Sequence, residues 1–477
     1  MDKKILVNSF FWNALGKYSS QIIAFIVSVV MARILMPSDY GVMGIIAVFI
    51  AISDIFIDCG FANALINKKQ CTQSDYSTVF FCNILISIGI FILLYISAPY
   101  IADFYKMEIL VPTIRVMGLS FIITSIGAVS RTILIKNLKF KESAIITIIS
   151  AICSGCIGIC LALYGYGVWA LIFQSLLTNI ITIILQFINV KWIPSFIFSH
   201  KSFHELFSFG GKILGSNIIW QLHSKMYSIV IGKFFTPADL AYFTRAEGYS
   251  VLIPGNIGGI LQNILFPILS KIKDDDKELL AMDYKLVKQS SIILFPLCLL
   301  LAGAAHPIII LMLTEKWEPV VPLLQILCIG VLLDHIPSIN SNIFLTKGKS
   351  GFFLKMQTIT KPISLILLLG TVFVNLEAAA WSKSISMFIN VGVSYYYLKK
   401  ILPVSIHKTF KNLYIPLISS SCLGLGLYYF YNFVPQTWLF LFIGILLYII
   451  VYIFIIYIYD KENVLSVLHL IRSLKNK

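Results

Sequence analysis

The sequence predicts an all-α, polytopic membrane protein of about fourteen transmembrane helices. They form two six-helix lobes, related by a pseudo-two-fold axis along the membrane normal, plus two C-terminal helices. Composition, a series of apolar runs and an internal repeat predict this class. The 477 residues are 58% hydrophobic and 12% charged, with a mean hydropathy of +0.89. Because this polar content is too small to cover a water-soluble globule, the solvent must be lipid.

The net charge of +15 does not indicate a nucleic-acid partner. Nucleic-acid binding needs a clustered basic patch, whereas these charges come in twos to fours between apolar runs. The nine cysteines lie mostly inside apolar runs and argue against a disulfide framework. Cys153, Cys156 and Cys160 have partly metal-like spacing but no second ligand cluster, so we interpret them as small apolar helix residues and expect no metal.

The transmembrane spans are predicted from apolar runs of roughly 20 residues, the length that crosses a bilayer at about 1.5 Å per residue. The first run is too long for a signal-peptide core and no A-x-A site follows it, so we expect it to remain uncleaved. The fourteen predicted spans are 10–35, 42–61, 77–101, 109–135, 143–163, 168–190, 207–231, 250–270, 286–313, 320–345, 352–374, 377–398, 413–433 and 438–459.

The connections between spans carry an asymmetric charge that predicts orientation. With the N-terminus in the cytoplasm, the inner segments carry 23 basic residues and the outer ones only four, which are Lys106, Lys233, Arg245 and Lys316. An even number of spans, with both termini cytoplasmic, fits this alternation.

The sequence also repeats itself. ARILMPSDY (32–40) aligns with GKFFTPADL (232–240), and KMEILVP (106–112) aligns with KWEPVVP (316–322). Two matches in the same order predict a duplicated unit of six spans. Six is even, so both copies enter from the same side and the repeat is parallel. The predicted domains are an N-terminal lobe (1–200), a C-terminal lobe (201–405) and two further helices with a basic tail (406–477).

No motif predicts catalysis. TKGKSG (346–351) resembles the end of a phosphate-binding loop, but Ile343 stands where the first glycine is required. There is no H-E-x-x-H or G-x-S-x-G pattern, and the longest loops are too short to fold as a soluble domain. We therefore expect a protein that is not an enzyme and has no cofactor.

Ten basic residues lie within the predicted spans, where an unpaired charge costs several kcal/mol and usually faces a cavity. Lys361 lies about 14 Å into its span, and Arg115 and Lys225 lie six or seven residues from outer ends. We interpret these three as cavity-facing. Four others lie close enough to span ends to extend to the membrane surface: Arg33, Arg131, Lys288 and Lys355. The remaining three are Lys17, Lys212 and Lys383.

Acidic residues in the spans are fewer: Asp54, Asp58 and Asp334, with Glu247 near an interface. A surplus of positive charge in a low-dielectric cleft attracts anions, such as a diphosphate or an acidic sugar. Asp54 and Asp334 are candidates either for pairing with a lysine or for binding a coupling proton or sodium ion. Pro254, Pro296 and Pro337 predict helix bends.

Five segments carry a resemblance to a known family through their order and spacing as well as their residues. They are APYIADFY (98–105), RTILIKNLKF (131–140), YGVWAL (166–171), LFPILSKIKDD (265–275) and EKWEPVVPLLQIL (315–327). They resemble the polysaccharide transporter family, and more closely its Wzx-type lipopolysaccharide and exopolysaccharide flippases. These belong to the multidrug/oligosaccharidyl-lipid/polysaccharide exporter superfamily. The resemblance spans roughly 8–397 and fades over the last two spans.

The resemblance implies alternating access about a central, basic cavity and export of undecaprenyl-diphosphate-linked oligosaccharide units across a bacterial inner membrane. The basic residues taken as substrate-binding are Arg115, Lys212, Lys225 and Lys361. Expected partners are the lipid-linked oligosaccharide, membrane lipids and other polysaccharide assembly proteins, with no nucleic acid.

Two alternatives remain open. An ion-coupled drug or metabolite exporter would share this architecture but should prefer acidic cavity residues for cationic drugs. A membrane-embedded glycan polymerase or ligase would need long outer loops, which the sequence lacks.

Overall fold

The computed structural model describes residues 3–58 and 60–459, and within these ranges the chain forms α-helices, one 3₁₀ helix and no strand. Some side chains within these helices lie outside the description: those of residues 3–10, 57–58, 209–217, 219–220, 253, 256–264 and 266–267. The predicted all-α membrane class is confirmed. The chain divides into two compact units, which we call unit 1 (Met1–Ala241) and unit 2 (Tyr242–Lys477).

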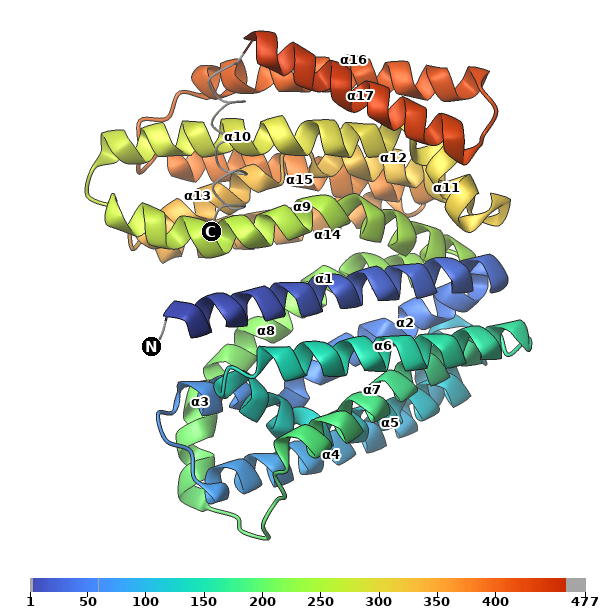
Figure 1. Ribbon diagram of the computed structural model, residues 1–477, viewed down its shortest axis with the longest axis vertical. Coiled ribbons are helices and arrows are strands. Elements are labelled where there is room, and N and C mark those ends of the chain that lie inside the picture. The colour runs from blue at the N-terminus through green and yellow to red at the C-terminus, as the bar shows by residue number, and fades with distance from the viewer. Residues whose placement is uncertain (1–2, 59, 460–477) are drawn as a thin grey trace. The chain divides into compact units, whose positions relative to one another are not determined.

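Unit 1 is a bundle of seven long helices and one short helix, and it also contains the first residues of α9 (Figure 1). Its helices are α1 (Lys3–Ile34), α2 (Pro37–Asp58), α3 (Phe61–Asn67), α4 (Gln73–Tyr105), α5 (Leu110–Lys136), α6 (Phe140–Leu163), α7 (Val168–Val190) and α8 (His200–Phe234).

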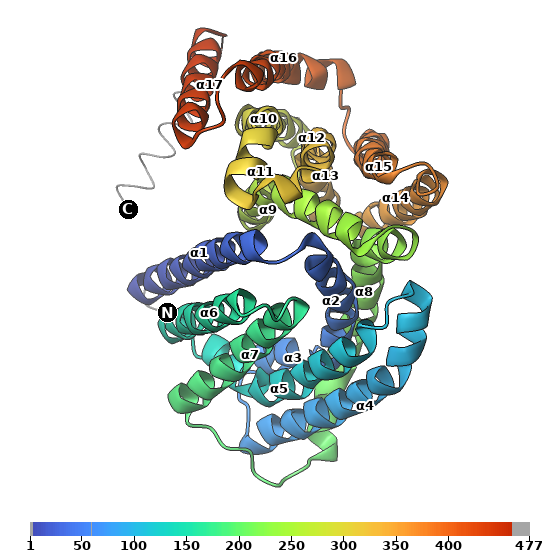
Figure 2. The ribbon, with the colours of Figure 1, turned by 90° about the vertical axis from the view of Figure 1, so that its right-hand side faces the viewer.

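Small residues set the close packing of unit 1. A Cβ on Gly16 of α1 would lie 2.5 Å from the Cβ of Ala144 on α6, and one on Gly155 would lie 2.5 Å from Val27 Cγ2. Both contacts join residues 128 positions apart, so α1 and α6 run parallel and side by side (Figure 2). Without a hydrophobic force between helices in lipid, small residues of this kind allow the close approach that dispersion requires.

The end of unit 1 near α3 is tied together by polar contacts. Lys136 donates from Nζ to the carbonyl oxygens of Leu65 (2.6 Å) and Lys68 (2.5 Å) at the end of α3. Lys68 contacts Asp75 and Glu205, each at 3.0 Å. Burial lowers the pKa of Lys68, but its hydrogen bonds to Glu205 and Asp75 outweigh burial and raise the pKa above its ordinary value. The pattern therefore favours a fixed, charged lysine at this end.

Unit 2 contains most of α9 (Pro237–Lys271) and all later elements (Figure 1). These are α10 (Asp276–Gly303), α11 (Ala305–Leu313), the 3₁₀ turn η1 (Glu315–Trp317), α12 (Val320–Val331), α13 (His335–Thr346), α14 (Ser350–Thr371), α15 (Leu376–Leu398), α16 (Ile406–Phe433) and α17 (Trp438–Tyr459).

Unit 2 also packs through small residues and buried hydroxyls. A Cβ on Gly303 of α10 would lie 2.5 Å from the carbonyl oxygen of Gly424 on α16. Ser384 of α15 donates to the Ile326 carbonyl of α12 at 2.9 Å, and Tyr452 of α17 donates to the Ile292 carbonyl at 2.8 Å. The outer faces remain apolar, with Leu446 62% and Phe454 63% exposed on α17. Such surfaces suit contact with acyl chains.

Each of the fourteen predicted spans contains helix, but two of them are broken. The span at 286–313 is divided between α10 and α11 at Ala304, and the span at 320–345 is divided between α12 and α13 at 332–334. Eleven described stretches are long and apolar enough to cross a membrane. The count of fourteen stays a prediction.

The helix breaks do not coincide with the prolines at which bends were predicted. Pro337 lies in the first turn of α13, where its missing N–H costs no helical bond, whereas α10 continues through Pro296 and α9 through Pro254. The second break therefore precedes its proline.

Helix α8 groups with unit 1, because it packs on α2, α3 and α4. The loop before it also follows α4, with the Ser195 N–H donating to Ser77 Oγ at 3.0 Å. The predicted lobe boundaries at 200 and 405, and the pseudo-two-fold axis, stay predictions.

Candidate functional site

Unit 1 contains a cavity of about 540 Å³ between α2, α3, α5 and α7, with both polar and apolar residues in its wall. This volume is within the range of ligand pockets. The residues that line it are Asp54, Ala62, Asn63, Ile66, Thr124, Gly127, Ala128, Arg131, Thr132, Ile135, Asn179, Thr182, Ile183 and Gln186. We call it the unit 1 cavity.

Asp54 and Arg131 give the unit 1 cavity its charges. Asp54 lies on α2 and Arg131 on α5, both are exposed to the cavity, and they lie within electrostatic range of each other. Arg131 was expected only to extend from the end of its span to the membrane surface, but it lines the cavity. The side chain of Asp58, the other acidic residue expected here, lies outside the described part.

Hydroxyl and amide groups also contribute to the wall of the unit 1 cavity. Gln186 of α7 lies against α5, where a Cβ on Gly127 would stand 3.0 Å from its Oε1. The Thr132 hydroxyl donates a hydrogen bond to the Ala128 carbonyl oxygen at 2.9 Å, so the hydroxyl oxygen can still accept one. Together with one cation and one anion, these groups can hydrogen-bond a sugar or a phosphate ester.

Unit 2 contains a charge cluster formed by Glu247 of α9, Asp334 of the turn between α12 and α13, Lys361 of α14 and Lys383 of α15. Lys361 lies 11 residues after α14 begins and ten before it ends, hence about 16 Å and 15 Å from its ends. Asp334 is within electrostatic range of Lys361 and Lys383. Ionisable side chains at such depth are expensive in lipid and mark functional positions.

A direct ion pair joins two members of the unit 2 charge cluster. Lys383 Nζ donates to Glu247 Oε1, and the same ammonium lies 5.5 Å from the ring centroid of Phe243. Two residues before Glu247 on α9, the Arg245 guanidinium lies 5.4 Å from the Trp317 ring centroid. Acidic and basic charges are equal in number in this cluster and in the unit 1 cavity. The positive surplus predicted for a central cavity stays a prediction.

Unit 2 also holds an apolar cavity of about 640 Å³ between α10, α12, α15 and α16. Leu299, Ile329, Phe388 and Leu425 contribute to its wall, and the Gln325 amide donates to the Ala302 carbonyl at 3.3 Å. A cavity of this character suits a hydrocarbon chain rather than a sugar.

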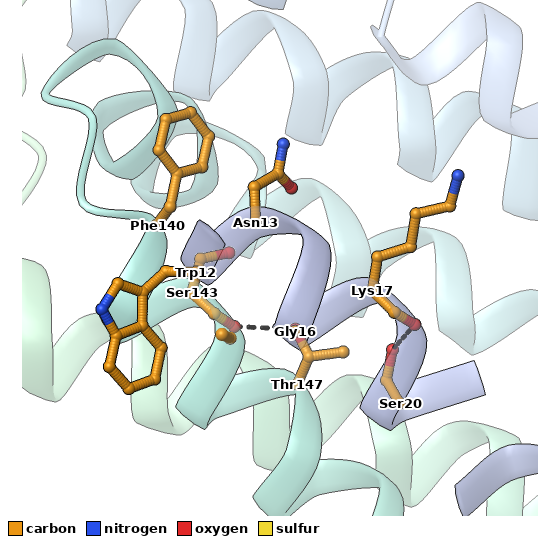
Figure 3. A pocket seen from close by; sticks show the side chains of 9 residues that line it. Trp12, Asn13, Gly16, Lys17, Ser20, Phe140, Ser143 and Thr147 are labelled. Atoms are coloured by element: carbon orange, nitrogen blue, oxygen red, sulfur yellow. Dashed lines mark hydrogen bonds between the residues drawn. The ribbon is translucent and has the colours of Figure 1, made fainter. Parts of the chain in front are cut away.

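A smaller cavity, of about 150 Å³, lies between α1 and α6, where Gly16 packs against Ala144 (Figure 3). Figure 3 shows Asn13 and Lys17 projecting to the same side of α1, as a spacing of four residues requires. Nearby, the Lys141 ammonium of α6 lies 5.3 Å from the ring centroid of Trp12 on α1.

The four predicted substrate-binding residues are not brought together within either unit. The Arg115 guanidinium stacks 4.3 Å from the Tyr95 ring centroid, and its Nε donates to the Tyr95 carbonyl at 3.4 Å. Lys225 is half-buried on α8, and the Lys212 side chain lies outside the described part. Lys361 alone joins a described charge cluster.

Sequence reasoning did not select Arg131, Glu247 or Lys383 as site residues. Glu247 lies ten residues after α9 begins and Lys383 seven residues after α15 begins, and their opposite charges were the available signal. Their pairing depends on which helices are neighbours, which the sequence does not show.

Comparison with known proteins identifies relatives along most of the chain. Residues 30–322 match the model of a family described as polysaccharide biosynthesis protein. The teichuronic acid biosynthesis protein TuaB of Bacillus subtilis is 27% identical over 376 residues, covering 78% of each chain. The lipopolysaccharide biosynthesis protein WzxC of Escherichia coli is 23% identical over 428 residues, covering 87% of each.

Among solved structures, the fold is similar to that of the lipid II flippase MurJ in its inward closed conformation. The TM-score is 0.73 at 20% identity, over 97% of this chain and 100% of that one. This likeness establishes the fold.

Proposed function

Because the chain belongs to the polysaccharide biosynthesis protein family, we propose that it is a flippase for lipid-linked sugars. It moves undecaprenyl-diphosphate-linked oligosaccharide units from the cytoplasmic to the periplasmic leaflet by alternating access, for lipopolysaccharide or exopolysaccharide biosynthesis. The observation that carries the proposal is the family match over 30–322, supported by relatives named for polysaccharide biosynthesis.

The physical task is to carry a sugar and a diphosphate past hydrocarbon. Burying their polar groups without hydrogen-bond partners costs several kcal/mol for each group. The unit 1 cavity offers hydroxyl, amide and guanidinium donors, and the unit 2 charge cluster offers two ammonium groups at depth. These groups replace the water that the headgroup loses.

The hydrocarbon part of the substrate has a different requirement. A polyprenyl chain is stable in lipid and needs only an apolar surface to follow the headgroup. The apolar cavity of unit 2 supports this role, because its wall is formed mainly by Leu, Ile and Phe side chains. Polar and apolar parts of one substrate thus have separate places in the chain.

Arg115, Lys212, Lys225 and Lys361 remain the proposed substrate-binding residues, and Asp54 and Asp334 the proposed ion-coupling or pairing residues. The proposed location is the bacterial inner membrane, with both termini cytoplasmic and with other polysaccharide assembly proteins as partners. Flipping moves a molecule without breaking a bond, so no catalytic residue or cofactor is required.

A strain that lacks this protein tests the function. It should stop exporting its glycan and accumulate lipid-linked oligosaccharide, detected by mass spectrometry of lipid extracts. Restoring the gene should reverse both changes. Normal glycan export together with new sensitivity to cationic drugs would instead favour the drug exporter.

A further inference from the structure

Asp283 is a fully buried carboxylate to which none of the described residues donates a hydrogen bond. It lies on α10, seven residues after that helix begins at Asp276. Its exposed fraction is 0%, and neither carboxylate oxygen has a partner within the described part. An ionised carboxylate in such a place loses its hydration and gains nothing in return, at a cost of several kcal/mol.

The neighbouring acids at the start of α10 are provided with partners. Asp276 contacts Lys347 Nζ at 2.6 Å. Asp275 accepts from the backbone N–H groups of Lys277 (2.8 Å) and Glu278 (3.0 Å), and these bonds hold the pKa of Asp275 below its ordinary value. The exposed acids are therefore stabilised as anions, whereas the buried one is not.

The layer around Asp283 is closely packed. Leu279 and Val287, one turn away on either side, are 0% and 1% exposed. Tyr395 of α15 lies within electrostatic range of Asp283, and its hydroxyl, beside Thr409, lacks a hydrogen bond of normal geometry. A hydroxyl oxygen can accept a hydrogen bond from a neutral carboxyl group.

The ionisable groups of the elements packed on α10 have other contacts. Lys408 of α16 lies 4.9 Å from the Tyr284 ring centroid, and His335 of α13 contacts Ser291, which is about 12 Å along α10 from Asp283. Four more groups are engaged or placed elsewhere: Tyr284 accepts from the Ser405 N–H, His306 of α11 contacts Gln436, Cys328 of α12 is buried in the core, and Tyr452 of α17 donates to Ile292. His407 and Lys411 of α16 are exposed.

We propose that Asp283 is a proton-binding site of unit 2, occupied in the described conformation and emptied when this end of the unit opens to water. The carboxylate takes one proton from cytoplasmic water to become a carboxyl group and returns it to water on opening. A proton needs no space in a closely packed layer, whereas a hard metal cation needs about six oxygen ligands. No metal-binding group of three or more His, Cys, Asp or Glu occurs among the described residues.

Proton binding links conformation to pH, because the closed layer binds a proton that the open layer releases. The binding itself does not depend on what the protein transports. The idea that one proton moves in each transport cycle rests on the proposed flippase function.

Infrared spectroscopy of the full chain in lipid nanodiscs tests the site. The carbonyl stretch of protonated carboxyl groups is recorded at pH 7 in ordinary and heavy water, for the wild type, Asp283→Asn and the matched control Asp276→Asn. We expect a deuterium-sensitive band in the wild type that is lost in Asp283→Asn and retained in Asp276→Asn. Carbon-13 labelling of aspartate carboxyl groups in the wild type should shift this band, which provides a readout without any substitution.

Two outcomes would overturn the proposal: a wild type with no protonated aspartate band at pH 7, or an equal band in Asp283→Asn. A band that responds to sodium chloride at constant pH would point to a sodium site and would also overturn it. None of these outcomes bears on glycan flipping. Conversely, normal glycan export in the gene-deletion strain would overturn the flippase function and leave the infrared result unchanged.

Discussion

At the scale of residues, charge is tolerated in this protein where a neighbouring helix supplies the opposite charge. Glu247 and Lys383 are 136 residues apart in sequence but form an ion pair with side chains 28% and 13% exposed. Removing one partner leaves the other charge poorly solvated, which costs more than removing both.

This pair gives the first prediction. Lys383→Gln and Glu247→Gln should each lower the stability of unit 2 by roughly 1–3 kcal/mol, and the double variant should lose less than the sum of the two. Thermal unfolding of the purified proteins in detergent measures this, with Lys355→Gln as a control because Lys355 is exposed. Additive losses would show that the two charges do not stabilise each other.

Lys361 gives the second prediction. Replacing it with Gln keeps the length of the side chain but removes the charge at mid-membrane, so glycan export should fall about tenfold or more, as expected for a loss of roughly 1.4 kcal/mol or more of attraction to an anion. Lys355→Gln is again the matched control, because it lies on α14 nearer the helix start. Export by Lys361→Gln equal to that of the control, at matched protein levels, would remove Lys361 from the passage.

The site residues predicted from the sequence stay predictions, and the sequence did not show how the charged residues are grouped. Depth within an apolar run identified Lys361 and Asp334, because distance from a helix end depends only on local sequence. Arg131 was assigned to the membrane surface because it lies near its span end, yet it lines the unit 1 cavity. Which face of a helix meets a cavity depends on tertiary neighbours, which a single sequence does not specify.

At the scale of elements, apolar runs predict helices well and their interruptions poorly. The run through Gly303, Ala304 and Ala305 is continuous in composition, so it was predicted as one span. In the structure, α10 ends at Gly303, which lies against the backbone of Gly424. That contact joins residues 121 positions apart, so no local pattern could show it.

The third prediction tests this contact. Gly303→Ala places a methyl group 2.5 Å from a backbone oxygen, so α10 and α16 must separate, at a cost of roughly 1–3 kcal/mol. Gly370→Ala on α14 is the control, since its Cβ would meet nothing within 4 Å, and it should be neutral or slightly stabilising. Thermal unfolding compares the two. Equal stability of both variants would contradict the close approach.

At the scale of the whole molecule, the charge pattern of the connections predicts the orientation in the membrane. Basic residues are held on the cytoplasmic side during insertion. The fourth prediction is that reporter fusions after Lys69, Lys141, Lys277 and Lys400 report cytoplasm. Fusions at Lys106, Tyr166 and Lys316 should report periplasm. Inversion at any two of these sites would contradict the fourteen-span topology.

We propose that this chain alone moves a lipid-linked oligosaccharide between leaflets. The purified protein, reconstituted into vesicles that carry undecaprenyl-diphosphate-linked oligosaccharide, should make the sugar on the inner leaflet accessible to a glycosidase added outside. Accessibility should rise from about half to nearly all of the substrate, and Lys361→Gln should slow the rise. Accessibility that stays at the level of protein-free vesicles would contradict the account.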